Sequence, residues 1–419
     1  MSIRTYYDPL HKGITLDTNI PEEALIMQLI DSSPFQRLRR IRQLGPASLT
    51  FHGAESSRFT HSLGVFEISR KALNGLLNIN PDLKKFRLIL YSAALLHDLG
   101  HGPFSHTSEG IFNLNHEQWS ANLIENHPEI SDPLEKFNSG YSIEIANLIR
   151  GKDSPNKAIK ALISSQLDCD RLDYLIRDSY STGTNYGVLD LDRIIKALTL
   201  SPDGDLAIHP KGLPAVEHYL VTRNLMYKSV YNHRLNEVAN WLLEKIFTIA
   251  RDLGPEIVWA DENISKWLWN KNEIGLDDFI ANDDIVVSYH LHRWKEGKHK
   301  ILSELCYRYI NRILFKAIDI NILSNENQIK ALAIARSIAS KNGLDPDTTC
   351  GIKKQKLHGY HPYKGGLRLW DGKNLKALEN ASPLVRSLIR PEESTWLIYE
   401  RKIHSPLKKE IDLLINELN

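Results

Sequence analysis

Seven of the 17 histidines in this sequence lie between His52 and His127. The imidazole side chain binds metal ions and exchanges protons near neutral pH, so such a cluster indicates a site where chemistry occurs. At its centre an apolar run ends in His97 and Asp98, and two glycines and a proline follow within five residues. This pattern predicts a helix that ends in a loop and places both side chains where the core meets a cleft. Taken alone, the pair is explained at least as well by a buried core histidine or a charged helix end as by a metal site.

A polar stripe is expected on the last turns, residues 168–178, of a helix that we predict over residues 157–178. Asp170, Tyr174 and Asp178 are spaced four residues apart and share one face of that helix. Apolar residues at positions 172, 175 and 176 lie on the opposite face. The alternative is a solvated face, but such faces more often carry Lys and Glu than a Tyr between two Asp. We therefore interpret the stripe as one wall of a site.

Helices must position most of these residues. Apolar spacing predicts a first helix from Pro21 that is interrupted at residues 31–34, where a second helix begins. Further helices are predicted over residues 61–77, 83–99, 117–126, 143–149, 157–178, 192–198, 214–251 and 325–341. A Pro-Asp-Gly turn predicts a β-hairpin over residues 198–208, and a second β patch is expected over residues 350–370. The predicted fold is mostly α, with a core domain over residues 1–253 and an α-rich accessory or oligomerisation region over residues 254–419.

Composition narrows the class of protein. The 419 residues carry 52 Lys plus Arg against 51 Asp plus Glu, a net charge of +1 that argues against a generally basic protein. Nucleic acid is therefore not indicated as a partner, although a local basic cleft is compatible with this total. Three cysteines are too few and too scattered for a disulfide framework. No apolar run has the length of a signal peptide or a membrane span, so we expect a cytoplasmic protein that does not bind membranes.

The order of the histidine and aspartate motifs resembles the HD-domain phosphohydrolases, and in more detail their deoxynucleoside triphosphate triphosphohydrolases. Within that group the chain is most similar to the type that joins a sterile alpha motif to an HD domain, although we expect no sterile alpha motif here. The resemblance runs in order from Arg4 to Asn236 and includes the segments FQRLR (35–39), RIRQLG (40–45), RFTHSLG (58–64), LHDLGHGPFSH (96–106), HEQ (116–118), DY (173–174), RD (177–178) and TRN (222–224). It implies an HD-domain helical bundle for the core.

The resemblance also implies a metal and a catalytic group. The metal would be held by His61, His97, Asp98 and Asp170. Two imidazoles and two carboxylates form a mixed nitrogen and oxygen site that suits Fe, Mn, Zn, Ni or Mg. The catalytic group would consist of His101, His106, Glu109 and His116. The family usually has Asp at the position of Glu109, and the alternative for the two loop histidines is that they only cap a turn.

For the substrate, the resemblance implies a deoxynucleoside triphosphate (dNTP). Its phosphates would be bound by Arg58, Arg171 and Arg223, because guanidinium groups pair well with phosphate oxygens. The related enzyme type has Lys at the position of Arg171, and each arginine alone is more often a surface ion-pair partner. The sugar would be bound by Gln43, Tyr174, Asp178 and Tyr231. The base preference stays open.

Three further residues match an activating site of this enzyme type. Asp31, Gln36 and Arg39 correspond to residues that bind a guanine nucleotide between subunits. The match implies GTP or a dNTP as an effector and a homo-oligomer, either a dimer or a tetramer. The alternative is that Asp31 caps the helix that starts near Pro34 and that the other two are ordinary surface residues.

Together these residues lead us to expect an enzyme that hydrolyses dNTPs to deoxynucleoside and inorganic triphosphate. One alternative is an HD-type nuclease or cyclic-nucleotide phosphodiesterase. A second alternative is a nucleotide sensor that does not catalyse a reaction. The complete set of metal ligands and loop histidines favours catalysis over sensing.

Overall fold

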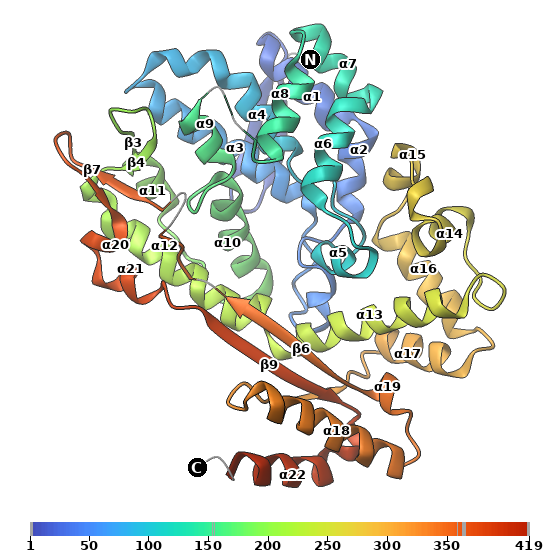
Figure 1. Ribbon diagram of the computed structural model, residues 1–419. Helices are drawn as coiled ribbons and strands as arrows, with labels where there is room; N and C mark the ends of the chain where they lie inside the picture. The colour runs from blue at the N-terminus through green and yellow to red at the C-terminus, as the bar shows by residue number, and fades with distance from the viewer. Residues whose placement is uncertain (1–2, 153, 155, 358, 363–365, 417–419) are drawn as a thin grey trace. The chain divides into compact units, whose positions relative to one another are not determined.

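The computed structural model describes residues 3–152, 154, 156–357, 359–362 and 366–416 (Figure 1). Helices dominate these residues, which confirms the prediction of a mostly α fold. The chain forms two compact units: unit 1 comprises residues 1–226, 274–285 and 359–390, and unit 2 comprises residues 227–273, 286–358 and 391–419. Each unit therefore draws on both of the predicted regions 1–253 and 254–419, and that predicted division stays a prediction.

Unit 1 is a helical bundle that contains a fully buried helix, α4 (Arg87–Leu96). Residues 88–96 of α4 are all buried, because a helix that is apolar on every side must be covered on every side. Each fully buried Leu or Ile contributes roughly 1.5 to 3 kcal/mol to folding. The other α-helices of unit 1 are α1 (Pro21–Asp31), α2 (Ser33–Arg37), α3 (Arg58–Leu77), α5 (His106–Phe112), α6 (His116–Asn126), α7 (Pro128–Phe137), α8 (Tyr141–Ile149), α9 (Lys157–Ile163), α10 (Cys169–Thr182), α11 (Leu191–Ala197), α12 (Leu213–Met226), α15 (Leu276–Ile280), α20 (Leu378–Ala381) and α21 (Pro383–Ser387). No helix among the described residues is long and apolar enough to cross a membrane.

The helix predicted over residues 157–178 is two helices, α9 and α10. Residues 164–168 separate them, and the side chain of Asp168 accepts a hydrogen bond from the backbone N–H of Arg171 at 2.8 Å. Such an N-cap stabilises a helix start by about 1 kcal/mol. The new start therefore fixes where the stripe of Asp170, Tyr174 and Asp178 begins on α10.

The strands of unit 1 form two small sheets. The predicted hairpin is confirmed as β3 (Leu198–Leu200) paired antiparallel with β4 (Leu206–Ile208). That sheet continues with β7 (Arg368–Trp370) and β8 (Leu375–Ala377) in the order β3-β4-β7-β8. The sequence did not predict the N-terminal hairpin of β1 (Ile3–Asp8) and β2 (Lys12–Asp17).

Unit 2 combines helices with a three-stranded antiparallel sheet of order β5-β9-β6. The strands are β5 (Lys316–Asp319), β6 (Cys350–Leu357) and β9 (Glu392–Tyr399), and the long pair of β6 and β9 is visible in Figure 1. The predicted β patch over residues 350–370 thus contains β6 of this sheet and β7 of the other sheet, and residues 358 and 363–365 lie outside the described residues. The helices are α13 (Arg234–Leu253), α14 (Glu262–Trp269), α16 (Asp284–Lys295, which begins in unit 1), α17 (Lys300–Ile310), α18 (Asn325–Lys341), α19 (Pro346–Thr349) and α22 (His404–Asn416).

Candidate active site

The four predicted metal ligands lie together in unit 1. His61 comes from the first turn of α3, His97 and Asp98 directly follow α4, and Asp170 is the second residue of α10. His61 Nε2 lies 3.0 Å from Asp170 Oδ1 and 3.5 Å from Asp98 Oδ2. His97 Nε2 lies 3.6 Å from Asp170 Oδ1 and 3.3 Å from Asp98 Oδ1. Three helix ends thus bring two imidazoles and two carboxylates to one point.

The orientation of both imidazole rings suits a cation. His61 Nδ1 donates to Asp173 Oδ2 at 2.8 Å and His97 Nδ1 donates to the carbonyl of Ala94 at 2.9 Å, so each ring presents Nε2 to the carboxylates. Among the described residues neither of these buried Nε2 atoms has a hydrogen-bond partner. Burial disfavours a charged His61, but Asp170 and Asp173 outweigh this effect and raise its pKa to about 10. A setting that favours a proton on this ring favours a divalent cation in its place, so the residues fit the predicted metal.

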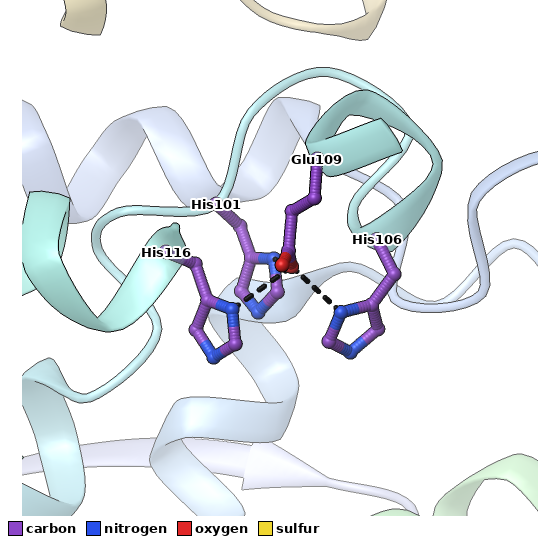
Figure 2. Close-up of side chains that lie close together, drawn as sticks. All are labelled: His101, His106, Glu109 and His116. Carbon is purple, nitrogen blue, oxygen red and sulfur yellow. Dashed lines mark hydrogen bonds and ion pairs between the residues drawn. The ribbon is translucent and has the colours of Figure 1, made fainter. Parts of the chain in front are cut away.

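The predicted catalytic group forms a second cluster, shown in Figure 2. Glu109 Oε1 lies between two histidines, 2.7 Å from His106 Nδ1 and 2.9 Å from His116 Nδ1. The ring of His101 stacks on that of His116 at 4.0 Å and meets that of His106 edge-on at 4.8 Å. Burial opposes ionisation of Glu109, but its two histidine partners prevail and lower its pKa to about 2. The cluster is therefore a carboxylate that orients imidazole rings.

The buried Asp98 connects the two clusters. Its Oδ1 atom lies 3.3 Å from His97 Nε2 and 3.2 Å from His101 Nε2. Its Oδ2 atom accepts a hydrogen bond from Arg58 Nη1 at 2.5 Å. Burial and the neighbouring side chains of Arg58 and His116 lower the pKa of His101 well below its usual value, which keeps that ring neutral. The candidate metal ligands and the histidine cluster thus form one continuous polar site.

A buried network behind His61 was not assigned a role from the sequence. Asp173 Oδ1 accepts from His11 Nε2 at 2.6 Å, and Asp173 Oδ2 accepts from His61 Nδ1 and from Arg177 Nε at 2.7 Å. Arg177 also donates to Asp8 at 2.8 Å, so the turn of the N-terminal hairpin is tied to the site. The only signal in the sequence was that Asp173 and Arg177 belonged to motifs of the resemblance. The network fixes the orientation of His61, a candidate metal ligand, from outside the candidate ligand set.

The residues predicted to bind the substrate differ in their burial and in the side chains they contact. Arg58 is engaged by Asp98 and, through Nε, by Ser105 Oγ at 2.8 Å, and Arg171 is paired with Asp168. Gln43 is buried, and its Oε1 atom has no hydrogen-bond partner among the described residues. On α10 Tyr174 is half-buried and Asp178 is buried, while Arg223 is buried on α12 of the same unit. Tyr231 ends the π-helical turn Tyr227–Tyr231 of unit 2. Their substrate contacts stay predictions.

Of the predicted effector residues in unit 1, Asp31 and Arg39 are exposed and Gln36 is half-buried. Asp31 is the last residue of α1 and pairs with Arg4 Nη1 at 2.7 Å. Gln36 donates to the carbonyl of Ile30 at 2.7 Å and accepts from Arg39 Nε at 2.8 Å, while Arg39 stacks on Phe59. The alternative that Asp31 caps the following helix is wrong, because the N-cap of α2 is Ser32 and makes no side-chain cap bond.

Comparison with known proteins places this site in a family. The HD domain family matches residues 58–178, and the HD associated region matches residues 189–253. The chain is 35% identical over 409 residues to the uncharacterized protein YwfO of Bacillus subtilis, covering 95% of this chain and 92% of that protein. It is 32% identical over 240 residues to the deoxynucleoside triphosphate triphosphohydrolase SAMHD1 homolog of Dictyostelium discoideum, which is 54% of this chain and 46% of that protein.

A solved structure supports the same assignment. The fold resembles the crystal structure of a phosphohydrolase from Bacteroides thetaiotaomicron with a TM-score of 0.83 and 28% sequence identity, over 95% of this chain and 100% of that one. The HD domain match contains all four candidate metal ligands and all four residues of the histidine cluster. The chain therefore belongs to the HD-domain phosphohydrolase family.

Proposed function

We propose that this protein hydrolyses dNTPs to deoxynucleoside and inorganic triphosphate. The observation that carries the proposal is the junction at Asp98, whose Oδ1 atom lies within 3.3 Å of one imidazole from each cluster, that of His97 and that of His101. The similarity to named dNTP triphosphohydrolases, although it spans about half of each of those proteins, supports the choice of substrate.

Each cluster has its own part in this reaction. His61, His97, Asp98 and Asp170 would hold a divalent cation, either Mg or a transition metal such as Fe, Mn, Zn or Ni. A bound cation would polarise a phosphate oxygen and lower the pKa of a bound water. Because Glu109 occupies Nδ1 of His106, the Nε2 atom of that exposed ring would exchange a proton with the substrate. The neutral ring of His101 would donate its single N–H to Asp98 Oδ1 and so hold the carboxylate that joins the two clusters.

Product analysis tests this function against its alternatives. The metal-loaded protein is incubated with each dNTP and each NTP, and the products are separated by anion-exchange chromatography. We expect inorganic triphosphate and a deoxynucleoside. A nucleoside monophosphate as product would instead indicate a nuclease or phosphodiesterase, and no turnover with any substrate would indicate a sensor.

Two variants separate the roles of the two clusters. Asp170→Ala should lose both metal and activity, because it removes a carboxylate that faces both imidazoles. His106→Ala should retain metal and slow the chemical step, since removal of a general acid or base costs about 10² to 10⁴ in rate. Metal analysis of both purified variants checks this, and loss of metal from His106→Ala would make His106 a ligand.

We also propose that GTP or a dNTP activates the enzyme as an effector and promotes a homodimer or homotetramer. Asp31, Gln36 and Arg39 would contact this nucleotide, since Asp31 is exposed and the donors of guanine could replace its partner Arg4. A cavity of about 430 Å³ in unit 2 also suits phosphates, because the described residues that line it include basic side chains and no acidic one. Its basic lining residues are Arg234, Arg312, Lys316, Arg401 and His404. The effector proposal would be refuted if neither the rate of hydrolysis nor the molecular mass measured by light scattering changed on addition of GTP or any dNTP.

A further inference from the structure

A segment outside both family matches packs against the candidate active site. Residues 274–285 belong to unit 1, whereas the HD domain and its associated region match residues 58–178 and 189–253. Phe279 of this segment stacks on Trp119 with ring centres 4.2 Å apart. The carbonyl of Asn282 accepts a hydrogen bond from Arg37 Nε at 2.8 Å. The segment is therefore anchored to α2 and to α6, which begins at His116.

The loop that joins His101 to His106 has an unusual backbone. Phe104 has φ 58° and Ser105 has φ 57° with ψ −129°, so two consecutive residues with side chains adopt conformations that favour glycine. Such conformations cost free energy and persist only where surrounding contacts hold them. His106, the first residue of α5, follows directly. The direction of its side chain therefore depends on whatever stabilises this strained turn.

Within residues 274–285, Asp284 contacts this turn through its carboxylate. Its Oδ1 atom accepts a hydrogen bond from the backbone N–H of Phe104 at 2.7 Å, and its Oδ2 atom accepts one from the backbone N–H of Arg42 at 3.0 Å. Asp284 is buried, so these bonds are shielded from water. Ser105 Oγ closes the arrangement by donating to the carbonyl of Arg42 at 2.6 Å.

The two bonds of Asp284 join parts of the site that are far apart in sequence. Arg42 precedes Gln43, the predicted sugar contact, and Phe104 lies between His101 and His106. Two backbone N–H donors require two acceptor oxygens, which a carboxylate supplies and an amide does not. Replacement by Asn would leave one of the two donors facing an N–H₂ group.

We propose that Asp284 is a positioning residue of the active site, whose carboxylate holds the strained Phe104–Ser105 turn and thereby sets the place of His106 beside His101 and Glu109. The catalytic part of this proposal rests on the proposed triphosphohydrolase function. The structural part, that the turn loses its conformation without Asp284, can be measured independently of any activity.

The test compares variants of two adjacent buried carboxylates. Asp284→Ala removes both loop bonds, and Asp284→Asn is the milder variant in case the first does not fold. Asp283→Asn is the matched control, because Asp283 is similarly buried and its carboxylate pairs with Arg40 Nε at 2.5 Å. The full-length, metal-loaded proteins are studied at pH 8, above the pKa of Asp284, which burial raises to about 6. Hydrogen exchange, metal content, kcat and KM for a dNTP are measured for each.

We expect both Asp284 variants to bind metal normally and to lose exchange protection locally, over residues 99–109. Their kcat should fall on the order of 100-fold, because misplacing a catalytic group by about 1 Å has that effect, while KM stays close to that of the wild type. Asp283→Asn should match the wild type in protection and kcat.

Three outcomes would separate the proposal from the proposed function. Unchanged loop protection in the Asp284 variants overturns the positioning role, whatever the activity. If the wild type is active and the Asp284 variants lose loop protection but keep the kcat of the wild type, the turn does not position a catalytic group. If the wild type hydrolyses no dNTP, the proposed function fails, and the exchange data alone decide whether Asp284 holds the turn.

Discussion

Two glycines of α3 provide a controlled test of how tightly the site is packed. A Cβ atom on Gly64 would lie 1.9 Å from Asp173 Oδ1 and 2.6 Å from Arg177 Nη2. A Cβ atom on Gly75, in the same helix, would meet nothing within 4 Å. Both Gly→Ala changes improve helix propensity by about 1 kcal/mol, so the difference between them isolates the effect of the buried network.

The size of the effect follows from these distances. To reach an ordinary contact of 3.4 Å, the carboxylate of Asp173 must retreat by about 1.5 Å, and its hydrogen bonds of 2.6 to 3.0 Å to His11, His61 and Arg177 then break. Overpacking costs about 1 to 3 kcal/mol, and disrupting a buried ion pair costs about 3 to 5 kcal/mol. After some relaxation we expect Gly64→Ala to lower the free energy of unfolding by about 3 kcal/mol. Gly75→Ala should raise it by roughly 0.5 to 1 kcal/mol.

Urea unfolding followed by circular dichroism measures both changes. The proteins are first treated with a chelator, because a metal that binds only the folded state adds its own stabilisation. Metal affinity is then measured separately, and Gly64→Ala should bind metal more weakly, since His61 loses the partner that orients its ring. Equal stability of the two variants would show that Asp173 can move freely and that the network does not constrain the site.

The remaining predictions concern single charged groups and the metal. Burial raises the folded pKa of Asp284 to about 6, above its ordinary 3.8, so the folded state disfavours the ionised carboxylate. As the pH rises from 5 to 7, the free energy of unfolding of the wild type should therefore fall by about 1 kcal/mol relative to that of Asp284→Asn. Parallel stability curves for the two proteins would contradict that pKa. Asp173→Asn should reduce metal affinity about 10- to 100-fold in competition with a chromophoric chelator. Glu125→Gln, which weakens a less buried pair with Arg150, should leave the affinity unchanged. Removal of the metal with a chelator should lower the melting temperature and stop product formation, and both should recover when metal is added back. No change on chelation would show that the site holds no cation.

Elements with local signals could be predicted from the sequence. The apolar run of α4 and the Pro-Asp-Gly hairpin of β3 and β4 have patterns that depend only on neighbouring residues. The N-terminal hairpin has only a short apolar alternation, Ile14 and Leu16 of β2, and β1 has none. Its other buried residues are Asp8 and His11, which form ion pairs with Arg177 and Asp173.

In the site, too, features that depend on neighbouring residues could be predicted, and contacts between distant residues could not. The two groups that meet at Asp98 were implied by the resemblance of their motifs to a known family, because spacing alone does not bring together residues from three separate helix ends. The supports of the site could not be predicted, since Asp284 bonds a residue 180 positions away and His11 bonds one 162 positions away. A carboxylate that stabilises a strained turn or orients a ligand has no periodicity and no motif of its own.

The alternation of the two units along the chain has a consequence for protein synthesis. A nascent chain that has reached Met226 contains every candidate metal ligand, but unit 1 still lacks residues 274–285 and 359–390. Domains that fold during translation begin at the N-terminus, whereas β4 must wait for β7, which follows it by 160 residues. Metal could bind such an intermediate before Asp284 leaves the ribosome. Metal loading and catalytic competence would then be acquired in that order, separated by the time needed to translate the intervening segment.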